Sequence, residues 1–290
     1  MTPWAWGAMR ACEGAQTSRP AGLARFLGQA HDAGAGWIDC ADIYANGRSE
    51  ALVGEALARD PGLRGRFQII AKAGVVLPGP NGAGTAHYRN DAGHLRGQLE
   101  ASLKRLKLDQ VDLFLVHRPD YLMDAEDTAG ALKAMISGGL TKAVGVSNFS
   151  VWQTDRLQRA LGAPITANQL EVSVLATEAL DDGRLDQALA DKAQVFAWGP
   201  LAGGRLFDPD DAAARRLRAL LARLAGGTDA EAVAGAALAW LAHHPSRPIP
   251  ILGSCRIERL AAQVKAAASA RITPEGWYAV LEAARGARVP

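Results

Sequence analysis

The stretch GWIDCADIYANG, residues 36–47, begins like a buried β-strand and then breaks that pattern. Its apolar start, GWI, is followed by the carboxylate of Asp39 at the point where the hydrophobic run of a core strand would continue. Tyr44 stands in the segment just beyond. An acid in this place indicates either a cap or turn former, or a functional group delivered to the end of the strand.

Short apolar runs of the same kind recur along the chain, and helical patterns separate most of them. Leucines spaced by three and four residues, as in Leu95–Lys107, indicate the helices. The expected strands are Trp4–Met9, Gly36–Asp39, Phe67–Lys72, Val111–His117, Lys142–Ser147, Ile165–Gln169, Gln194–Trp198 and Pro248–Gly253. The other expected helices are Arg19–Ala33, Ser49–Arg59, Ala125–Ser137, Val151–Leu161, Asp182–Asp191, Asp229–His243 and Cys255–Ala268. Because strands and helices alternate, and several strands are apolar throughout, this order predicts an α/β fold, a (β/α)8 TIM barrel.

No linker-like stretch or compositional break divides the chain, so we expect one domain over residues 1–290. Two stretches rich in turn residues, Gly74–Arg89 and Ala202–Arg215, are predicted to be long loops. An extra C-terminal helix is expected over Pro274–Ala284. A doubly wound open sheet is the alternative fold, but no GxGxxG motif follows the first strand, as such a dinucleotide-binding fold would usually require.

Composition argues against several classes of protein. The formal net charge is +2 and the basic residues are spread along the chain, so we expect no nucleic-acid or membrane-surface partner. Cys12, Cys40 and Cys255 are far apart and form no CxxC pair, which argues against disulfides and a metal site. The sequence also has no pattern of a signal peptide or transmembrane helix. We therefore expect a protein of the reducing cytoplasm.

Ionisable residues end three successive expected strands. Asp39 ends the second strand, Lys72 ends the third in FQIIAK, and His117 ends the fourth in DLFLVH. In an eightfold barrel the carboxyl ends of the strands form one rim, and that rim carries the chemistry. The sequence therefore predicts an acid, a base and an imidazole at one mouth, with Tyr44 close enough to join them.

These four residues have the properties of a proton-donating set. A free tyrosine has a pKa of about 10, but a nearby ammonium such as Lys72 stabilises the phenolate and lowers this pKa. Asp39 could keep Lys72 charged, because a buried lysine alone tends to lose its proton. His117 could orient a carbonyl oxygen towards Tyr44. Together these four residues predict general acid catalysis at a carbonyl.

Each of these residues also has a purely structural interpretation. An Asp at a strand end is often a cap or turn former, a Lys or His there is usually a hydrogen-bonded edge residue, and a Tyr often only packs. The conjunction of three such residues at successive strand ends, with a tyrosine beside them, favours the functional interpretation.

The motifs DCADIY, IIAK, DLFLVHRPD and VGVSNFS resemble those of the aldo-keto reductases, NAD(P)H-dependent carbonyl reductases built on a (β/α)8 barrel. The resemblance covers nearly the whole chain, and HRPD, NQLEVS and GGRLF look closest to bacterial oxidoreductases of this superfamily. The family's catalytic Asp, Tyr, Lys and His fall on Asp39, Tyr44, Lys72 and His117. The resemblance implies reduction of a small-molecule aldehyde or ketone with NADPH, by a protein expected to be a monomer.

The resemblance also implies where the nicotinamide lies. Ser147, Asn148 and Gln169 would bind its carboxamide, since a primary amide offers both a donor and an acceptor. Ser147 and Asn148 are equally suited to cap the helix that follows. Trp198 would stack on the nicotinamide, or else pack in the barrel core. Because glycine stands where the family commonly has serine, only backbone atoms would come from Gly199, Pro200 and Leu201.

The adenosine end of the cofactor would lie after the last strand. Gly253 and Ser254 precede a helical pattern, whose free N–H groups and dipole favour a phosphate. Many family members have a lysine where this chain has Gly253. Arg256 could supply that charge, and Arg259 matches the family's usual arginine. Two guanidinium groups suit a 2′-phosphate, which favours NADPH (NADP+) over NADH, although both could be solvated surface residues.

The chain departs from the family in two places. Its first strand begins almost at the start of the sequence, so the hairpin that usually closes the bottom of the barrel is expected to be absent. Met9 stands where relatives often have a tryptophan near the substrate pocket. Substrate specificity would lie in the loops and the C-terminal tail, the loops being Gly74–Arg89, Pro119–Asp127 and Ala202–Ala214.

Two other functions remain open from the sequence. One is an NADP(H)-binding regulatory or sensor protein with little turnover. The other is a barrel lyase or isomerase in which Lys72 is a Schiff-base nucleophile, although a lysine kept charged by Asp39 is a poor nucleophile.

Overall fold

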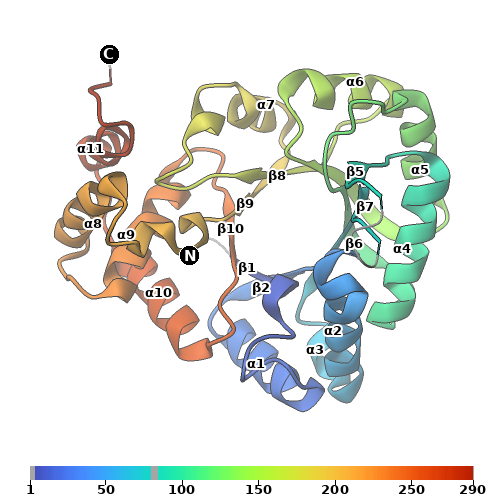
Figure 1. Ribbon diagram of the computed structural model, residues 1–290, viewed down its shortest axis with the longest axis horizontal. Coiled ribbons are helices and arrows are strands. Elements are labelled where there is room, and N and C mark those ends of the chain that lie inside the picture. Colours follow the sequence, from blue (N-terminus) through green and yellow to red (C-terminus); the bar gives the residue numbers. More distant parts are fainter. Residues whose placement is uncertain (1–3, 80–83, 290) are drawn as a thin grey trace.

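Eight parallel strands close into a barrel, which confirms the predicted architecture (Figure 1). The computed structural model describes residues 4–79 and 84–289. The strands neighbour one another in the order β1-β10-β9-β8-β7-β6-β3-β2, and β2 closes on β1. Their bounds are β1 Trp4–Gly7, β2 Ala35–Asp39, β3 Gln68–Ala73, β6 Val111–Val116, β7 Thr141–Ser147, β8 Ala167–Glu171, β9 Gln194–Trp198 and β10 Ile249–Leu252.

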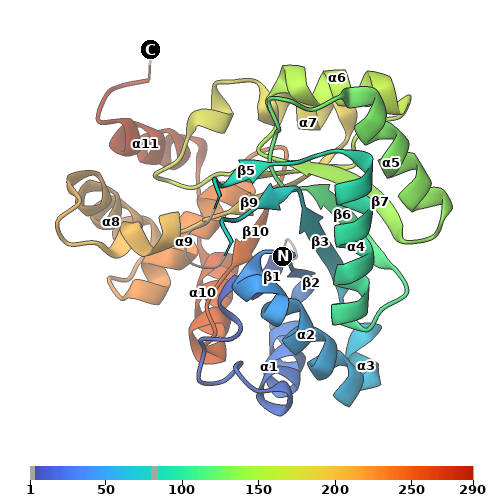
Figure 2. The ribbon, with the colours of Figure 1, turned by 45° about the vertical axis from the view of Figure 1, so that its right-hand side comes forward.

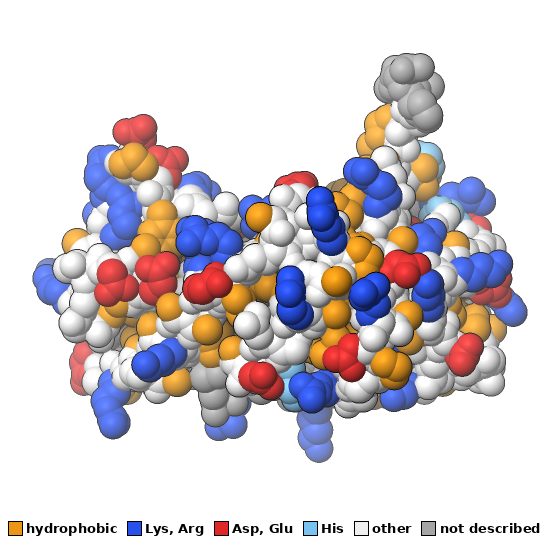
Figure 3. All heavy atoms as spheres, turned by 90° about the horizontal axis from the view of Figure 1, so that it is seen from below, with side chains coloured by type: hydrophobic (Ala, Val, Ile, Leu, Met, Phe, Trp, Pro, Cys, Tyr) orange, Lys and Arg blue, Asp and Glu red, His pale blue; other side chains and the backbone are white. Residues whose placement is uncertain are grey.

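Helices surround the barrel on its outside (Figures 1 and 2). They are α1 Pro20–Asp32, α2 Arg48–Arg59, α3 Pro61–Arg64, α4 Ala92–Leu106, α5 Ala125–Ser137, α6 Val151–Leu161, α7 Arg184–Asp191, α8 Ala212–Ala225, α9 Ala230–His243, α10 Ile257–Ser269 and α11 Pro274–Arg285. Aspartates that accept a backbone N–H begin several of them, including Asp91 at α4 and Asp229 at α9. Acidic and basic side chains are interspersed on the face shown in Figure 3, in keeping with the small net charge.

The barrel is filled by side chains that alternate along each strand. On β3, Ile69 and Ala71 belong to the core between strands and helices, whereas Ile70 belongs to a separate cluster with residues of the other strands. Leu113 and Leu115 of β6 are in this second cluster too. The period of two residues therefore divides each strand into positions that face the helices and positions that face the barrel interior.

Two expected loops contain regular structure that the sequence analysis missed. Within Gly74–Arg89, β4 (Val75–Val76) pairs antiparallel with β5 (His87–Tyr88), and residues 80–83 of that stretch lie outside the described part. The stretch Ala202–Arg215 holds a 3₁₀ turn over Ala202–Phe207 and the beginning of α8. The expected absence of an N-terminal hairpin concerns residues 1–3, which also lie outside the described part.

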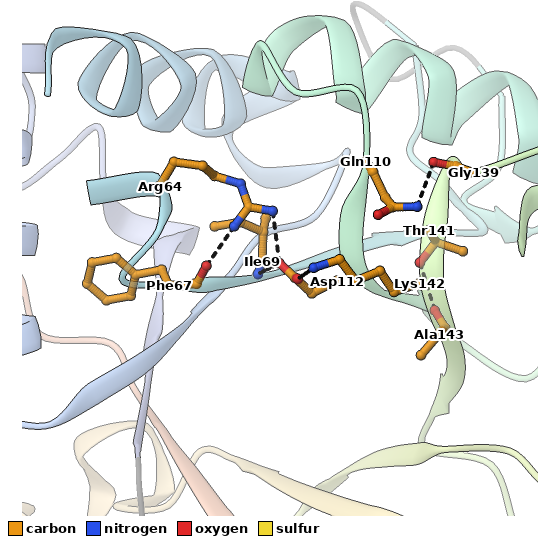
Figure 4. Close-up of polar contacts among 9 residues, drawn as sticks. All are labelled: Arg64, Phe67, Ile69, Gln110, Asp112, Gly139, Thr141, Lys142 and Ala143. Atoms are coloured by element: carbon orange, nitrogen blue, oxygen red, sulfur yellow. Dashed lines mark hydrogen bonds and ion pairs between the residues drawn. The ribbon is translucent and has the colours of Figure 1, made fainter. Parts of the chain in front are cut away.

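A buried carboxylate, Asp112, ties three elements together where β3, β6 and β7 begin (Figure 4). Its Oδ2 accepts from Arg64 Nη2 at 3.1 Å and from Ile69 N at 2.8 Å, and its Oδ1 accepts from Lys142 Nζ at 2.7 Å. Burial opposes the charged form, but the hydrogen bonds from Lys142 and Ile69 and the charge of Arg64 lower the pKa of Asp112. This cluster lies at the amino ends of the strands, away from the predicted catalytic rim.

We expect Asp112→Ala to destabilise the fold by about 2 kcal/mol, because it leaves Ile69 N–H and two cations without their shared acceptor. Urea unfolding measures this change, with Asp109→Ala, an exposed aspartate before the same strand, as the control. A surface control should change stability by less than about 0.5 kcal/mol. Equal stabilities of the two variants would contradict a structural role for the cluster.

Candidate active site

The polar residues at the carboxyl ends of the strands occupy the last inward-facing positions. Trp37, Ile70 and Leu115 face the interior, and the next inward positions on their strands are Asp39, Lys72 and His117. The parallel register sets Lys72 beside Leu115 and Asp39 beside Ile70. The same alternation brings Gln169 of β8 and Trp198 of β9 to the mouth of the barrel. One geometric rule thus places an ionic layer on top of an apolar core.

Lys72 forms the centre of this layer. Its side chain is fully buried, and its ammonium makes a short ion pair with Asp39 Oδ1. Gln169 Nε2, from across the barrel, donates to the same oxygen at 2.9 Å. Burial alone would lower the pKa of Lys72, but its interaction with the Asp39 carboxylate, followed by that with Tyr44, outweighs burial and the pKa is raised. The lysine is therefore a fixed cation at neutral pH.

Tyr44 lies over Lys72 and beside His117. The Lys72 ammonium is 5.1 Å from the centroid of the Tyr44 ring, and the Tyr44 and His117 rings meet edge to face with centroids 6.2 Å apart. Ala45 and Asn46 follow with positive φ angles of 49° and 54°, so the chain turns sharply just after the tyrosine. These contacts bring all four predicted catalytic residues together.

The direction of the Tyr44 pKa differs from the expectation. Burial raises the pKa of Tyr44 above its usual value and outweighs Lys72, whose charge lowers it. The phenol is consequently protonated at neutral pH. Burial, with the charges of Lys72 and Arg118, lowers the pKa of His117 well below 6.5, so its imidazole is neutral. Among the described residues, none bonds to the buried Nδ1 of His117.

A cavity of about 910 Å³ opens above this layer. Lys72 lies beneath the cavity, and its side chain is not part of the lining. The predicted site residues that line it are Asp39, Tyr44, His117, Ser147, Asn148, Gln169, Trp198, Gly199, Pro200, Leu201, Gly253, Ser254, Arg256 and Arg259. The candidate catalytic groups and the candidate phosphate groups thus share a single cavity.

Asn148 and Ser147 are held by the residues around them. Trp198 Nε1 donates to Asn148 Oδ1 at 2.9 Å, Asn148 Nδ2 donates to Ser147 Oγ at 2.8 Å, and Ser147 Oγ donates to Gln169 O at 3.1 Å. The chain of bonds fixes the indole of Trp198 on the cavity wall. The alternative of Ser147 and Asn148 as a helix cap is wrong, because Ser150 caps α6 in a capping box.

The lining fits a nicotinamide dinucleotide in its chemistry. One end offers hydroxyl, amide and indole groups from Ser147, Asn148 and Trp198. The other end offers the guanidinium groups of Arg256 and Arg259, which, among the described residues, form no ion pair. A planar aromatic amide and an anionic phosphate are the partners that such groups bind.

Several lining residues were missed or not placed by the sequence analysis. Arg10 lines the same end as Arg256 and Arg259, and Arg118 lies over Trp198 with its guanidinium carbon 5.5 Å from the ring centroid. Glu171 and Gln263 also line the cavity. Met9, which was expected near the substrate pocket, does line the cavity and has 54% of its surface exposed. Arg118 could have been suspected from its place after His117, whereas the others depend on how loops meet.

The chain belongs to the aldo-keto reductase family. The model of the Aldo/keto reductase family matches residues 5–284. The chain is 39% identical to a 6-dehydroglucose reductase of Novosphingobium aromaticivorans, in an alignment covering 100% of this chain and 94% of that protein. It is 40% identical to a 6-dehydroglucose reductase of Agrobacterium fabrum, covering 87% of this chain and 84% of that protein. These bacterial relatives are oxidoreductases of the type that the motifs predicted.

Solved structures agree with this membership. A glycerol dehydrogenase from Gluconobacter oxydans superimposes with a TM-score of 0.81 at 26% identity, covering 99% of this chain and 92% of that chain. A thermostable aldo-keto reductase solved with the inhibitor epalrestat gives a TM-score of 0.77 at 25% identity, covering 97% and 94%. Separately, none of the helices within residues 4–79 and 84–289 is long and apolar enough to cross a membrane.

A second buried acid, Asp42, lies close to the catalytic layer. Burial and the neighbouring Glu50 carboxylate raise the pKa of Asp42 to about 7, although a backbone hydrogen bond and the charges of Arg105 and Lys72 oppose the shift. Its Oδ1 has no hydrogen-bond partner among the described residues. Glu50 in turn accepts from Arg105 Nε at 2.7 Å. The folded protein therefore keeps the Asp42 carboxyl protonated up to a pH of about 7.

The raised pKa of Asp42 predicts that the free energy of unfolding of the wild type falls as pH rises, compared with that of Asp42→Asn. The folded-state pKa of about 7 lies above the unfolded value of 3.8. Between these values the unfolded chain loses a proton that the folded protein keeps, and the cost reaches about 4 kcal/mol at most above pH 7. Urea unfolding across this pH range measures the difference, with the exposed Asp32→Asn as control. Parallel pH profiles of wild type and Asp42→Asn would contradict the buried, raised-pKa carboxyl.

Proposed function

We propose that this protein reduces an aldehyde or ketone to an alcohol with NADPH, and that Tyr44 donates the proton. The observation that carries the proposal is the buried Lys72–Asp39 pair beneath Tyr44 and His117, at the wall of one cavity with a cationic end. Membership of the aldo-keto reductase family supports the reaction class.

His117 and Tyr44 would act together on the carbonyl oxygen. A neutral imidazole can donate a hydrogen bond to that oxygen without competing as a strong acid, and the protonated phenol of Tyr44 faces the same space. Bound NADPH would supply the hydride to the carbonyl carbon. Tyr44 would then give its proton to the developing alkoxide, which completes the alcohol and leaves a phenolate. Lys72, held as a cation by Asp39, would stabilise that phenolate until water restores its proton.

The raised pKa of Tyr44 is compatible with this role. A phenol that is fully protonated before the reaction is a competent proton donor, and the alkoxide that forms is a much stronger base than phenolate. Lys72 lowers the cost of the phenolate at the moment when the proton leaves. The lysine thus acts on the product of the transfer and need not make Tyr44 acidic in the resting protein.

The two ends of the cavity would hold the cofactor. Ser147, Asn148 and Gln169 would bind the carboxamide, with the fixed indole of Trp198 against the ring. Gly199, Pro200 and Leu201 would contribute backbone atoms. Ser254, Arg256 and Arg259 would bind the 2′-phosphate, which favours NADPH over NADH.

The burial of Lys72 argues against the lyase or isomerase alternative. A Schiff-base lysine must reach its substrate as a free amine, whereas Lys72 is fully buried, paired with Asp39 and charged. A sensor would bind NADP(H) but reduce little substrate. Measuring NADPH affinity beside turnover therefore separates a sensor from a reductase.

A sugar-like aldehyde is the first substrate to test. Two relatives are named 6-dehydroglucose reductases. Arg118 and Glu171 line the cavity together with the catalytic groups, and both can hydrogen-bond hydroxyl groups of a polyhydroxylated substrate. An activated aromatic aldehyde is the complementary probe, because its reduction depends little on such contacts.

We expect Tyr44→Phe to lose roughly a hundredfold or more of the turnover number, the scale of a lost general acid. NADPH oxidation by each aldehyde measures this loss, and NADPH affinity should be nearly unchanged. Tyr278→Phe, on α11 and half exposed, is the matched control.

Equal rates for Tyr44→Phe and wild type would remove Tyr44 from the chemistry. Wild type that binds NADPH tightly and turns over neither aldehyde would favour the sensor.

A further inference from the structure

Three arginines line the phosphate end of the cavity, and one of them comes from an unexpected element. Arg256 and Arg259 lie at the start of α10, whereas Arg10 lies in the segment between β1 and α1. Within the described residues, none of the three forms an ion pair, and the Arg10 side chain makes no hydrogen bond. Three unpaired cations at one end of a cavity favour an anionic ligand there.

The guanidinium of Arg10 lies beside Gly253. A Cβ atom built on Gly253 would be 3.2 Å from Arg10 Nη2, so the arginine occupies the space into which a side chain at position 253 would extend. The φ angle of Gly253 is outside the left-handed region, so the backbone itself does not require glycine. A side chain at position 253 would therefore require the Arg10 guanidinium to shift by a few tenths of an ångström, and a long side chain there would compete with it for the same space.

Other contacts hold the Arg10 segment against the start of α10, which lies beside α1 (Figures 1 and 2). Arg10 O accepts from Cys255 Sγ at 3.3 Å, and Gln16 Oε1 accepts from Ile257 N at 2.9 Å. Gln16 Nε2 donates to Glu258 at 3.0 Å, which keeps that carboxylate engaged. These hydrogen bonds between the segment after β1 and the start of α10 thus fix the position of Arg10.

We propose that Arg10 binds a phosphate group of the nicotinamide cofactor, as the cation that a side chain at position 253 would otherwise supply. The inference rests on the proposed function for the identity of the cofactor. A guanidinium can hold two phosphate oxygens at once. The 2′-phosphate and the diphosphate offer the same chemistry, and both would approach this end of the cavity. Glu13 also lines the cavity, and its carboxylate would limit the net positive charge near Arg10.

The test is the affinity of the purified protein for NADPH and for NADH, measured by calorimetry without any carbonyl substrate. We expect Arg10→Met to weaken NADPH binding about tenfold to a hundredfold, the scale of a lost charge-assisted hydrogen bond. The double variant Arg10→Met/Gly253→Lys should recover most of this loss, because removing the guanidinium frees the space for a lysine. Arg25→Met, an exposed arginine of α1, is the control and should bind as wild type.

The two cofactors locate the phosphate. If Arg10→Met weakens the binding of NADPH alone, Arg10 contacts the 2′-phosphate. If it weakens the binding of NADPH and NADH equally, Arg10 contacts the diphosphate. Unchanged affinity for both overturns the proposal. If Arg10→Met weakens binding and the double variant does not recover it, the proposal that a cation at position 253 can replace Arg10 is wrong.

Because binding is measured without turnover, this result is separate from that of the activity assay. A wild type that binds NADPH but reduces no carbonyl would leave the Arg10 test intact. A wild type that binds neither cofactor would overturn both proposals.

Discussion

The buried ion pair between Lys72 and Asp39 is the interaction on which the rest of the site depends. A lysine with no exposed surface retains its charge only because a carboxylate on the neighbouring strand lies against it. Gln169 holds that carboxylate from the opposite side of the barrel, so the pair also joins β2, β3 and β8. Tyr44 and His117 both respond to the same charge, the tyrosine through a stabilised phenolate and the histidine through a depressed pKa. A single fixed cation thus acts on both groups that face the cavity, although burial is the larger cause of both pKa shifts.

The alternation of inward and outward side chains explains why this pair lies at the mouth and not in the core. On β2, β3, β6 and β8 the apolar inward residues come first and a polar inward residue comes last, as Leu115 and His117 show at the end of β6. The apolar residues below exclude water, which strengthens the electrostatic interactions above them. The cationic end of the cavity is built differently, from Arg10 beyond β1 and from Arg256 and Arg259 at the start of α10 beyond β10. Under the proposed function, strands would position Asp39 and Lys72, whereas segments beyond the strands would contact the cofactor phosphates.

Much of the fold and the positions of the candidate catalytic residues were predictable, because apolar runs and leucine spacing are local signals. Helix α8 was missed because Pro209 and the aspartates before it suggested a loop, although Leu217 and Leu221 have helical spacing. The place of Arg10 beside Gly253 could not be read from the sequence, since it depends on contacts between segments at opposite ends of the chain. The pKa direction of Tyr44 was wrong for a similar reason: the sequence shows a nearby lysine but not the degree of burial.

The most direct test of the central claim is the turnover number of Asp39→Asn beside wild type, with folding and NADPH affinity measured on the same samples. This nearly isosteric change removes the charge that keeps Lys72 protonated, so burial would push the lysine towards its neutral form. The account predicts a folded variant that binds NADPH and loses roughly a hundredfold or more of turnover, because the phenolate of Tyr44 is no longer stabilised. Wild-type turnover in Asp39→Asn would contradict it.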